Sequence, residues 1–320
     1  MPCRICGQEA ATELGRIVPY RDYACAVYDC AACGCRFTEH SSDVYERLHG
    51  QSASSYARHD ALAQQCSALF HAGDAEGLRR LLLPSVTREL VMNALECLEP
   101  GAGVLEVGCS KGALASYFLA LGHDVLGVDV SESAIARARE LFGDHFELPG
   151  GPREAGPFDA IYHTGTIGCV ADPVGMTRGL LQKLKPGGQL VFNSPNARAC
   201  RRRGQLWLSS TVPPDLVTLF QPGFWRERFD DLAEAHVEEI RHEPATAWVE
   251  EAVRVVGPRW RLRSRGRVEA VEAPTRDRRR WLRERVEHRL RRLPLPTIDV
   301  PTDFGIHVCL TRRADGGQGD

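Results

Sequence analysis

Apolar residues recur with two periods along the chain, and the change of period predicts helices first and buried strands later. Between residues 41 and 98, apolar positions repeat every three or four residues, and Pro84 divides them into two helices. A breaker cluster at 99–101 ends this pattern, and the apolar run at 104–107 is typical of a buried parallel strand. We expect the helical segment to cover one end of the sheet, with Tyr56 as a lid residue or an ordinary surface residue.

A turn of small residues follows that strand, with the sequence GCSKG at 108–112. A helical stretch at 113–121 comes next, so the turn lies between strand and helix as in dinucleotide-binding folds. Small side chains at Gly108, Ser110 and Gly112 allow a ligand to approach the backbone. The turn lacks the Gly-Lys-Ser/Thr ending of a phosphate-binding loop, which excludes that motif.

A second apolar strand, residues 124–129, ends in an acidic residue. Asp129 lies 17 positions after Gly112, which places a carboxylate at the carboxyl end of this strand. A carboxylate there can accept hydrogen bonds from both hydroxyls of a ribose. Ser131 is predicted to cap a helix over 132–142. Ribose binding is the favoured role for Asp129, and a solvated or helix-capping carboxylate is the alternative.

Four of the twelve cysteines form two Cys-x-x-Cys pairs near the beginning of the chain. They are Cys3, Cys6, Cys30 and Cys33. Each pair precedes a glycine that tolerates the bend of a metal-binding knuckle, and the 23 residues between the pairs have room for a β-hairpin. Four thiolates would close a tetrahedral zinc site, which is typical of a structural metal. Buried cysteines or a redox pair are the alternatives, and Cys25 or Cys35 could replace one of the four ligands.

Composition excludes several classes of protein. The 320 residues are 43% hydrophobic and 26% charged, so the chain has enough apolar residues for a core and an accessory module. This composition excludes a chain that is disordered, collagen-like or coiled-coil over its whole length. Apolar runs stay shorter than the roughly 18 to 20 residues that span a bilayer. The chain begins Met-Pro-Cys-Arg without a basic and apolar leader, so we expect a cytoplasmic protein with reduced thiols.

The formal net charge is only −2, but the charges are unevenly distributed. Residues 254–292 contain 15 Arg and five acidic residues, a net charge of +10, against −12 for the rest of the chain. Arginines alternate along 259–267 as on a strand, and 276–292 has a helical pattern. A solvated basic face is the first interpretation, a site for a phosphate-bearing or carrier-bound substrate the second, and nucleic-acid binding the least favoured.

Together these motifs resemble the class I S-adenosylmethionine-dependent methyltransferases. Residues 106–112 and 127–129 are similar to the first two motifs of that family. Residues 157–163 resemble its fourth strand, Asp172-Pro173 the start of the following helix, and residues 184–191 the turn into its fifth strand. The order of these matches along the chain agrees with the family.

The resemblance implies an α/β fold with a Rossmann-like seven-stranded sheet. Residues 3–38 resemble the small zinc ribbon that precedes the catalytic domain in many bacterial biosynthetic methyltransferases. A helix at 223–236 and strands at 237–241 and 304–310 are expected to complete the sheet, with the basic insert before the last strand. The expected organisation is a zinc ribbon at 1–40, a helical connector at 41–98, a cofactor-binding core at 99–199, an acceptor-recognition region with closing strands at 200–313 and a disordered tail at 314–320.

The resemblance also implies a cofactor site. The turn would hold the amino-acid end of S-adenosylmethionine, Asp129 its ribose, and a carboxylate after the third strand its adenine. The expected cofactor-binding residues are Glu106, Gly108, Cys109, Ser110, Gly112, Asp129, Val130, Glu147 and His163. Relatives commonly have Leu-Glu-His-Val after the fourth strand, where this chain has Ile-Gly-Cys-Val at 167–170, so any role of that histidine does not transfer.

Acceptor chemistry is expected at the carboxyl edge of the same sheet. An oxygen or nitrogen acceptor needs alignment and sometimes a base. His163, at the end of the fourth strand, is the candidate base, and hydrogen bonding to the loop or cofactor is its alternative role. Residues 193–196 offer a second polar edge. Four aromatic residues either wall an apolar pocket or form core: Trp207, Phe220, Phe224 and Trp225.

We therefore expect a methyltransferase with structural zinc that methylates a small molecule at oxygen, nitrogen or carbon, in a specialised-metabolite or sugar-modifying pathway. An RNA methyltransferase that uses the ribbon and the arginines is one alternative. A cofactor-binding protein without catalysis, whose ribbon mediates assembly, is another, because residues 167–169 replace polar residues of the family.

Overall fold

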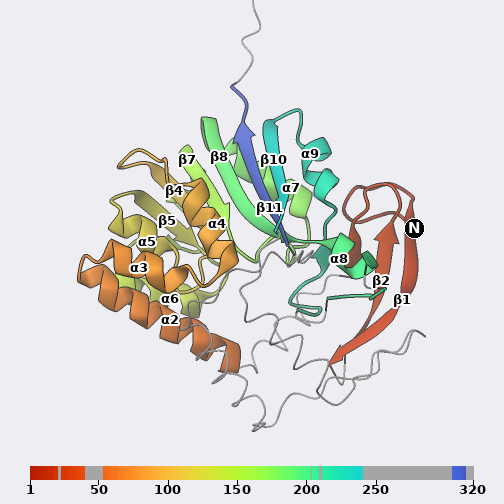
Figure 1. The fold of residues 1–320 in the computed structure, drawn as a ribbon, viewed down its shortest axis with the longest axis horizontal. Helices are drawn as coiled ribbons and strands as arrows, with labels where there is room; N and C mark the ends of the chain where they lie inside the picture. The colour runs from red at the N-terminus through yellow and green to blue at the C-terminus, as the bar shows by residue number, and fades with distance from the viewer. Residues whose placement is uncertain (21–22, 40–52, 203, 209–210, 241–304, 315–320) are drawn as a thin grey trace, which may run out of the picture.

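The computed structural model describes residues 1–20, 23–39, 53–202, 204–208, 211–240 and 305–314 (Figure 1). The basic insert at 254–292, the Tyr56 side chain and residues 315–320 of the expected tail lie outside the described residues. Within the described ranges, we find no helix that combines the length and the apolar content needed to cross a bilayer.

A seven-stranded sheet forms the centre of the molecule, as the sequence predicted. In spatial order its strands are β10 (Ala233–Glu239), β11 (Gly305–Arg312), β8 (Leu184–Pro195), β7 (Phe158–His163), β4 (Gly103–Val107), β5 (Asp124–Val128) and β6 (Phe146–Glu147). The five strands from β8 to β6 are parallel, and β11 runs antiparallel to both of its neighbours. The carboxyl ends of the parallel strands therefore meet at one edge, where open α/β sheets bind ligands.

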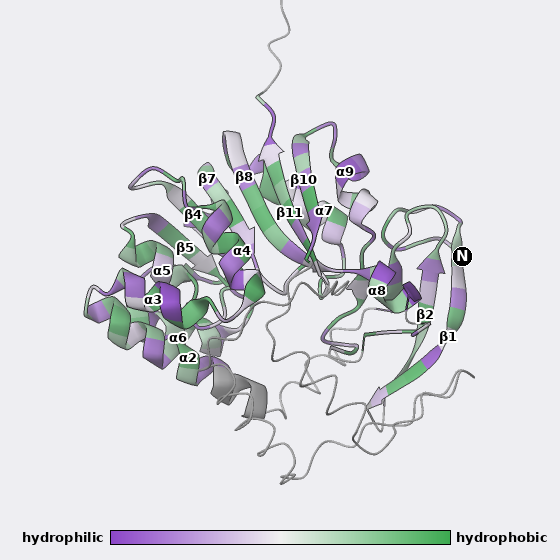
Figure 2. Ribbon diagram, viewed as in Figure 1, coloured by the Kyte–Doolittle hydropathy of each residue, from purple (hydrophilic) through white to green (hydrophobic). Residues whose placement is uncertain are grey.

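Helices cover both faces of this sheet, and its strands are coloured largely as hydrophobic (Figure 2). Buried apolar side chains of the strands pack against these helices. One face packs against α2 (Ala53–His71), α3 (Ala75–Leu82), α4 (Val86–Ala94), α5 (Ala115–Ala120) and α6 (Glu132–Phe142). The other packs against α7 (Pro173–Gln182) and α9 (Pro222–Arg228). The short helices η1 (Pro152–Ala155) and α8 (Ala197–Arg202) lie in connections. Buried branched and aromatic residues on both faces of the strands explain why the sheet is central.

Local capping signals fix the helix that follows β5. The Ser131 hydroxyl accepts a hydrogen bond from the Ala134 amide at 3.3 Å, so α6 begins at the predicted residue. Asp172 caps α7 in the same way through the Gly175 amide at 2.8 Å. Both helices therefore start where the sequence predicted, at the carboxyl edge of the sheet.

The N-terminal segment forms a second, four-stranded antiparallel sheet. Its strands are β1 (Ala11–Tyr20), β2 (Tyr23–Cys30), β3 (Arg36–Thr38) and β9 (Thr218–Leu219). The predicted hairpin between the cysteine pairs is confirmed as β1 and β2. The fourth strand comes from a segment about 180 positions later in the sequence, so the cysteine-rich unit is joined to the later part of the chain by β-pairing.

The sequence misplaced one helix and one strand near the end of the described core. The helix expected at 223–236 is only α9, which ends at Arg228 and is followed by a turn in which the Leu232 and Ala233 amides donate to the Phe229 carbonyl at 2.9 and 2.8 Å. The strand expected at 237–241 begins already at Ala233, since β10 pairs with β11 along its whole length. Sheet pairing here overrides the helical preference of an Ala- and Glu-rich segment.

Candidate functional site

The turn after β4 adopts a backbone that requires small residues. Gly108 and Gly112 both have a φ of +77°. A Cβ on Gly108 would lie 2.4 Å from the Thr166 Oγ1, and one on Gly112 would lie 2.6 Å from the Phe146 ring. Ser110, with a φ of +49°, also lies in the left-handed region. The predicted turn thus forms a tight backbone bend whose glycines have no room for a side chain.

Asp129 is joined directly to this turn. Its Oδ2 accepts a hydrogen bond from the Ser110 amide at 2.8 Å, and its Oδ1 accepts one from the Ser131 amide at 2.9 Å. The Gly108 and Cys109 amides both donate to the Val128 carbonyl, which holds the turn beside the end of β5. A carboxylate has about four acceptor positions, so Asp129 keeps capacity for ligand hydroxyls.

Two further predicted cofactor residues lie near the ends of β5 and β6. Val130 follows Asp129 and is 81% exposed. The Glu147 carbonyl accepts from the Asp129 amide at 3.4 Å, which pairs the two strand ends. The Glu147 Oε2 is buried without a hydrogen-bond partner among the described residues.

Glu106 lies within the sheet, on the face that α4 and α5 cover. It is 3% exposed, and its Oε2 accepts a hydrogen bond from the Tyr162 hydroxyl at 3.1 Å. Burial raises the pKa of Glu106 to about 8, against the lowering effects of Tyr162 and of the Arg88 charge on α4. The neighbouring Cys109 is also buried, and burial raises the pKa of its thiol. Glu106 is therefore a buried carboxyl group that a cationic ligand would ionise.

His163, the candidate base, is fully buried at the end of β7. Its ring stacks on Phe192 at 4.6 Å between centroids. Neither ring nitrogen has a hydrogen-bond partner among the described residues, and burial lowers the pKa of His163 to about 3. The imidazole is consequently neutral at physiological pH, and it is a weak base.

Asn193 and His307 form a second polar pair at this edge, on neighbouring strands. They are register partners of β8 and β11, and they are 6% and 7% exposed. Asn193 donates to the Thr87 carbonyl of α4 at 3.5 Å, whereas its Oδ1 and the His307 Nδ1 have no partner within the described part of the chain. Sequence analysis missed His307, although a lone histidine inside an apolar strand was the available signal.

Sequence analysis also missed an ionic contact that joins α2 to the turn. Asp60 accepts from the Lys111 ammonium at 3.2 Å and from the Arg137 guanidinium at 3.0 Å. These two side chains lower the pKa of the Asp60 carboxyl. The signal in the sequence was the cation at position 111, in a turn made otherwise of small residues.

The four predicted cysteines gather at one point. Cys3 and Cys33 lie 3.8 Å apart through their Sγ atoms, and Cys6 and Cys30 lie 3.7 Å apart. All four sulfur atoms lie within 4.8 Å of one another. Cys35 is buried outside this group.

The aromatic residues expected in the acceptor region belong to the core. Trp225 and Phe220 are fully buried, while Phe224 and Trp207 are 6% exposed. The Trp225 indole donates to the Ser194 hydroxyl at 3.0 Å. The structure thus supports the core interpretation of these four residues over a pocket wall.

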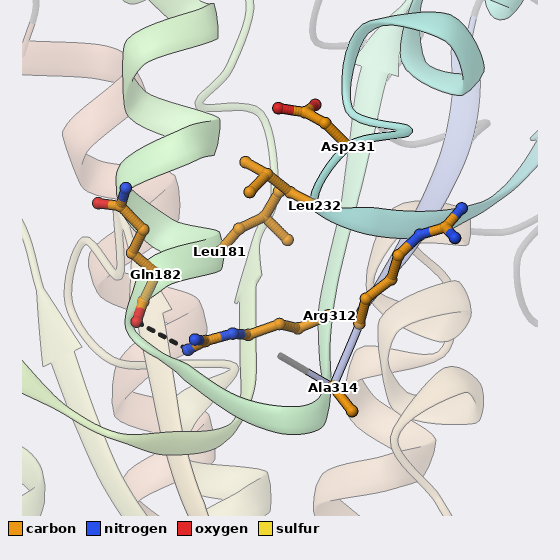
Figure 3. Close-up of a pocket in the computed structure, with 7 residues that line it drawn as sticks. Leu181, Gln182, Asp231, Leu232, Arg312 and Ala314 are labelled. Atoms are coloured by element: carbon orange, nitrogen blue, oxygen red, sulfur yellow. Dashed lines mark hydrogen bonds between the residues drawn. The ribbon is translucent and has the colours of Figure 1, made fainter. Parts of the chain in front are cut away.

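One hollow of about 440 Å³ lies at the opposite edge of the sheet (Figure 3). Gln182 at the end of α7 and Arg312 at the end of β11 line it, and the Arg312 guanidinium donates to the Gln182 carbonyl at 3.1 Å. Because β8 begins here and β11 ends here, this hollow lies at the amino edge of the parallel strands. It is therefore separate from the turn at 108–112.

Comparisons with known proteins match this part of the chain. Residues 77–232 match the family model described as a methyltransferase domain. The ubiquinone biosynthesis O-methyltransferase of Aromatoleum aromaticum is 33% identical over 105 residues, which cover 30% of this chain and 45% of that protein. The protein of the same name from Sodalis glossinidius is 28% identical over 131 residues, 38% of this chain and 51% of that protein. This chain therefore spans about half the length of these curated relatives.

Among solved structures, a possible histamine N-methyltransferase of Thermotoga maritima is 16% identical, with a TM-score of 0.43 over 77% of this chain and 99% of that one. That likeness is too low to add to the argument. The family match covers β4, the turn, Asp129 and the strands beside them. Because the site and the match coincide, residues 77–232 form a methyltransferase domain with the Rossmann-like fold of the class I S-adenosylmethionine-dependent methyltransferases.

Proposed function

We propose that this protein transfers a methyl group from S-adenosylmethionine to a small-molecule acceptor in a biosynthetic pathway. The observation that carries the proposal is the contact between Asp129 and the Ser110 amide, which places a carboxylate with spare acceptor capacity beside a glycine turn. The two relatives above are named as O-methyltransferases of ubiquinone biosynthesis, which favours oxygen over nitrogen or carbon as the acceptor atom.

Four of the predicted cofactor residues have individual roles in this proposal. Asp129 would accept the ribose hydroxyls, and the exposed Val130 would pack against the adenine. The unpartnered Glu147 Oε2 is available for an amine donor of the base. Glu106 would hold the amino-acid end together with the turn, since an ammonium group stabilises a buried carboxylate.

Methyl transfer is an in-line displacement at carbon. An acceptor oxygen would form a bond to the methyl carbon while the carbon–sulfur bond breaks, the electron pair of that bond would stay on sulfur in S-adenosylhomocysteine, and the hydroxyl proton would pass to water. The protein mainly aligns the two reactants. The unpartnered polar atoms of Asn193 and His307 are available to orient an acceptor hydroxyl. A base role for His163 stays a prediction, and its burial favours orientation or packing over proton removal.

We further propose that Cys3, Cys6, Cys30 and Cys33 bind one structural zinc ion. Zinc bound to four thiolates at about 2.3 Å places neighbouring sulfurs about 3.8 Å apart. The separations of 3.7 and 3.8 Å fit that tetrahedron. Four protein ligands leave no open position, so the metal would stabilise the fold and take no part in methyl transfer.

Transfer of a labelled methyl group tests this function. Purified, zinc-replete protein is incubated with methyl-labelled S-adenosylmethionine and a panel of hydroxylated aromatic acids and sugars, or with total RNA. We expect label in the small-molecule fraction, and a loss of at least tenfold in Asp129→Ala, because a hydrogen bond to a charged group contributes about 1.5 to 3 kcal/mol.

Label in RNA, together with salt-sensitive RNA binding, would support the rival RNA methyltransferase. Cofactor binding without transfer to any acceptor class would support the non-catalytic alternative. Either result would contradict the proposed small-molecule activity.

A further inference from the structure

Arg4 lies inside the first cysteine pair, but its side chain contacts the methyltransferase part of the chain. Its Nη1 donates to the Ala171 carbonyl at 2.9 Å, and its Nη2 donates to the Val217 carbonyl at 3.0 Å. The Nη2 also contacts the Thr218 hydroxyl. The guanidinium lies 5.8 Å from the centroid of the Phe37 ring, within the range of a cation–π contact. One side chain of the cysteine knuckle thus holds two separate segments.

The two segments are joined to each other as well. The Val217 and Thr218 amides both donate to the Gly168 carbonyl, at 2.8 and 3.0 Å. The Cys169 thiol donates to the Asp215 carbonyl at 2.7 Å. A Cβ on Gly168 would lie 2.3 Å from Leu216, so that segment fills the place where a side chain at 168 would be. Gly168 and Cys169 therefore serve to dock residues 215–218 against the loop that follows β7.

The same loop touches the cofactor turn at its other end. The Thr166 hydroxyl donates to the Val107 carbonyl at 3.2 Å. A Cβ on Gly108 would meet the Thr166 Oγ1 at 2.4 Å, so the Thr166 side chain packs directly against the Gly108 backbone. An unbroken series of hydrogen bonds and packing contacts runs from Arg4 through Gly168 and Thr166 to the turn.

We propose that Arg4 is a positioning residue that makes cofactor affinity depend on the cysteine knuckle. The planar guanidinium presents several donors in a fixed fork, and it can hold both carbonyls and the hydroxyl at once. The knuckle fixes the Arg4 backbone, and Arg4 fixes the loop at 165–171 against the turn. This inference rests on the proposed function, because it assumes that the turn binds S-adenosylmethionine.

The test compares Arg4→Leu and Arg4→Lys with the parent by calorimetry with S-adenosylhomocysteine, zinc analysis and hydrogen exchange. We expect both variants to keep one zinc per chain. Arg4→Leu should raise the Kd by about tenfold, within the usual range of coupling between sites, and should speed amide exchange at 166–171. Arg4→Lys should show a smaller loss, since a single ammonium replaces the fork.

Removal of zinc by a chelator provides the second arm of the test. It should weaken S-adenosylhomocysteine binding by the parent about as much as Arg4→Leu does. It should weaken binding by Arg4→Leu little further, because the link is already broken.

Arg201→Leu is the matched control. Arg201 also ties a cysteine knuckle to the rest of the chain, through the Gly34 carbonyl at 2.6 Å and the Asp29 carboxylate at 2.8 Å. Within the described part of the chain, the side-chain hydrogen bonds of Arg201 go to Asp29, Gly34 and Gln221, and none goes to the loop at 165–171. The Arg201→Leu variant should therefore bind S-adenosylhomocysteine like the parent.

Several outcomes would overturn the inference. If the parent binds S-adenosylhomocysteine and Arg4→Leu binds it equally well, the inference is wrong and the proposed function stands. If the parent itself binds none, the proposed function fails and the inference with it. Loss of both zinc and S-adenosylhomocysteine affinity in the Arg4 variants also contradicts it. The inference attributes the weaker binding to the broken Arg4 contacts and not to loss of the metal. If Arg4→Leu does not fold, Arg4→Lys decides, and parent-like affinity in it refutes the inference.

Discussion

Glu106 places an ionisable group in the interior of the sheet, next to the turn that we propose binds the cofactor. Desolvation is the largest cause of its raised pKa, and the Tyr162 hydroxyl and the Arg88 charge only partly offset it. Asp129, at the end of the next strand, adds to the rise. A carboxyl group whose pKa is raised by burial becomes a carboxylate when a ligand ammonium binds beside it, so the same residue affects both stability and binding.

The raised pKa makes the stability of the ligand-free protein depend on pH. The folded pKa of about 8 exceeds the ordinary value of 4.5, so the stabilisation is complete below pH 4.5 and is lost as the pH rises through 8. Each pKa unit corresponds to about 1.4 kcal/mol, so the loss amounts to a few kcal/mol. Urea unfolding at pH 5.5 and 8 should show that the free energy of unfolding falls less in Glu106→Gln than in the parent.

Glu76→Gln serves as the control for this measurement, because Glu76 is an exposed carboxylate on α3. It should keep the pH dependence of the parent. Equal slopes for the parent and Glu106→Gln would contradict the account of Glu106.

Elements were predictable from sequence where local signals and tertiary context agree. The Ser131 cap fixed the start of α6, and the apolar run before the turn fixed β4. β10 shows the opposite case, since its sequence favours a helix and only pairing with β11 makes it a strand. β9 could not be predicted from the sequence, because its two residues form a strand only through pairing with the distant β3.

Metal analysis of the cysteine-rich unit tests the zinc proposal at the scale of the structural element. Removal of one ligand from a closed tetrahedral site leaves an incomplete site, so Cys33→Ser should lose the metal that the parent binds at one zinc per chain. Faster hydrogen exchange in β1 to β3 should accompany the loss. Atomic absorption on the purified proteins gives the metal content.

Cys97→Ser is the control for metal analysis, because Cys97 is an exposed free thiol outside the cluster. It should retain one zinc. A parent protein free of zinc after purification and zinc incubation, or full retention in Cys33→Ser, would refute the assignment of the ligands.

At the scale of the whole molecule, the cysteine-rich unit and the seven-stranded sheet both contact the loop at 165–171, which lies beside the turn at 108–112. The sequence motifs were sufficient to predict the turn and Asp129, since both follow from one strand–turn–helix unit. They were insufficient for His307, Asp60 and Arg4, whose partners lie on elements distant in sequence. Contacts of that kind arise from the packing of the chain and leave no local pattern.

Calorimetry with S-adenosylhomocysteine tests most directly whether the turn and Asp129 bind the cofactor. Zinc-replete parent protein should bind one equivalent, and Asp129→Asn should bind about ten- to a hundredfold more weakly, as expected when a charged hydrogen-bond acceptor is lost. Asp144→Asn, a change of the same kind at an exposed carboxylate, should match the parent. No heat with the parent, or equal affinity in Asp129→Asn and the parent, would contradict the central claim.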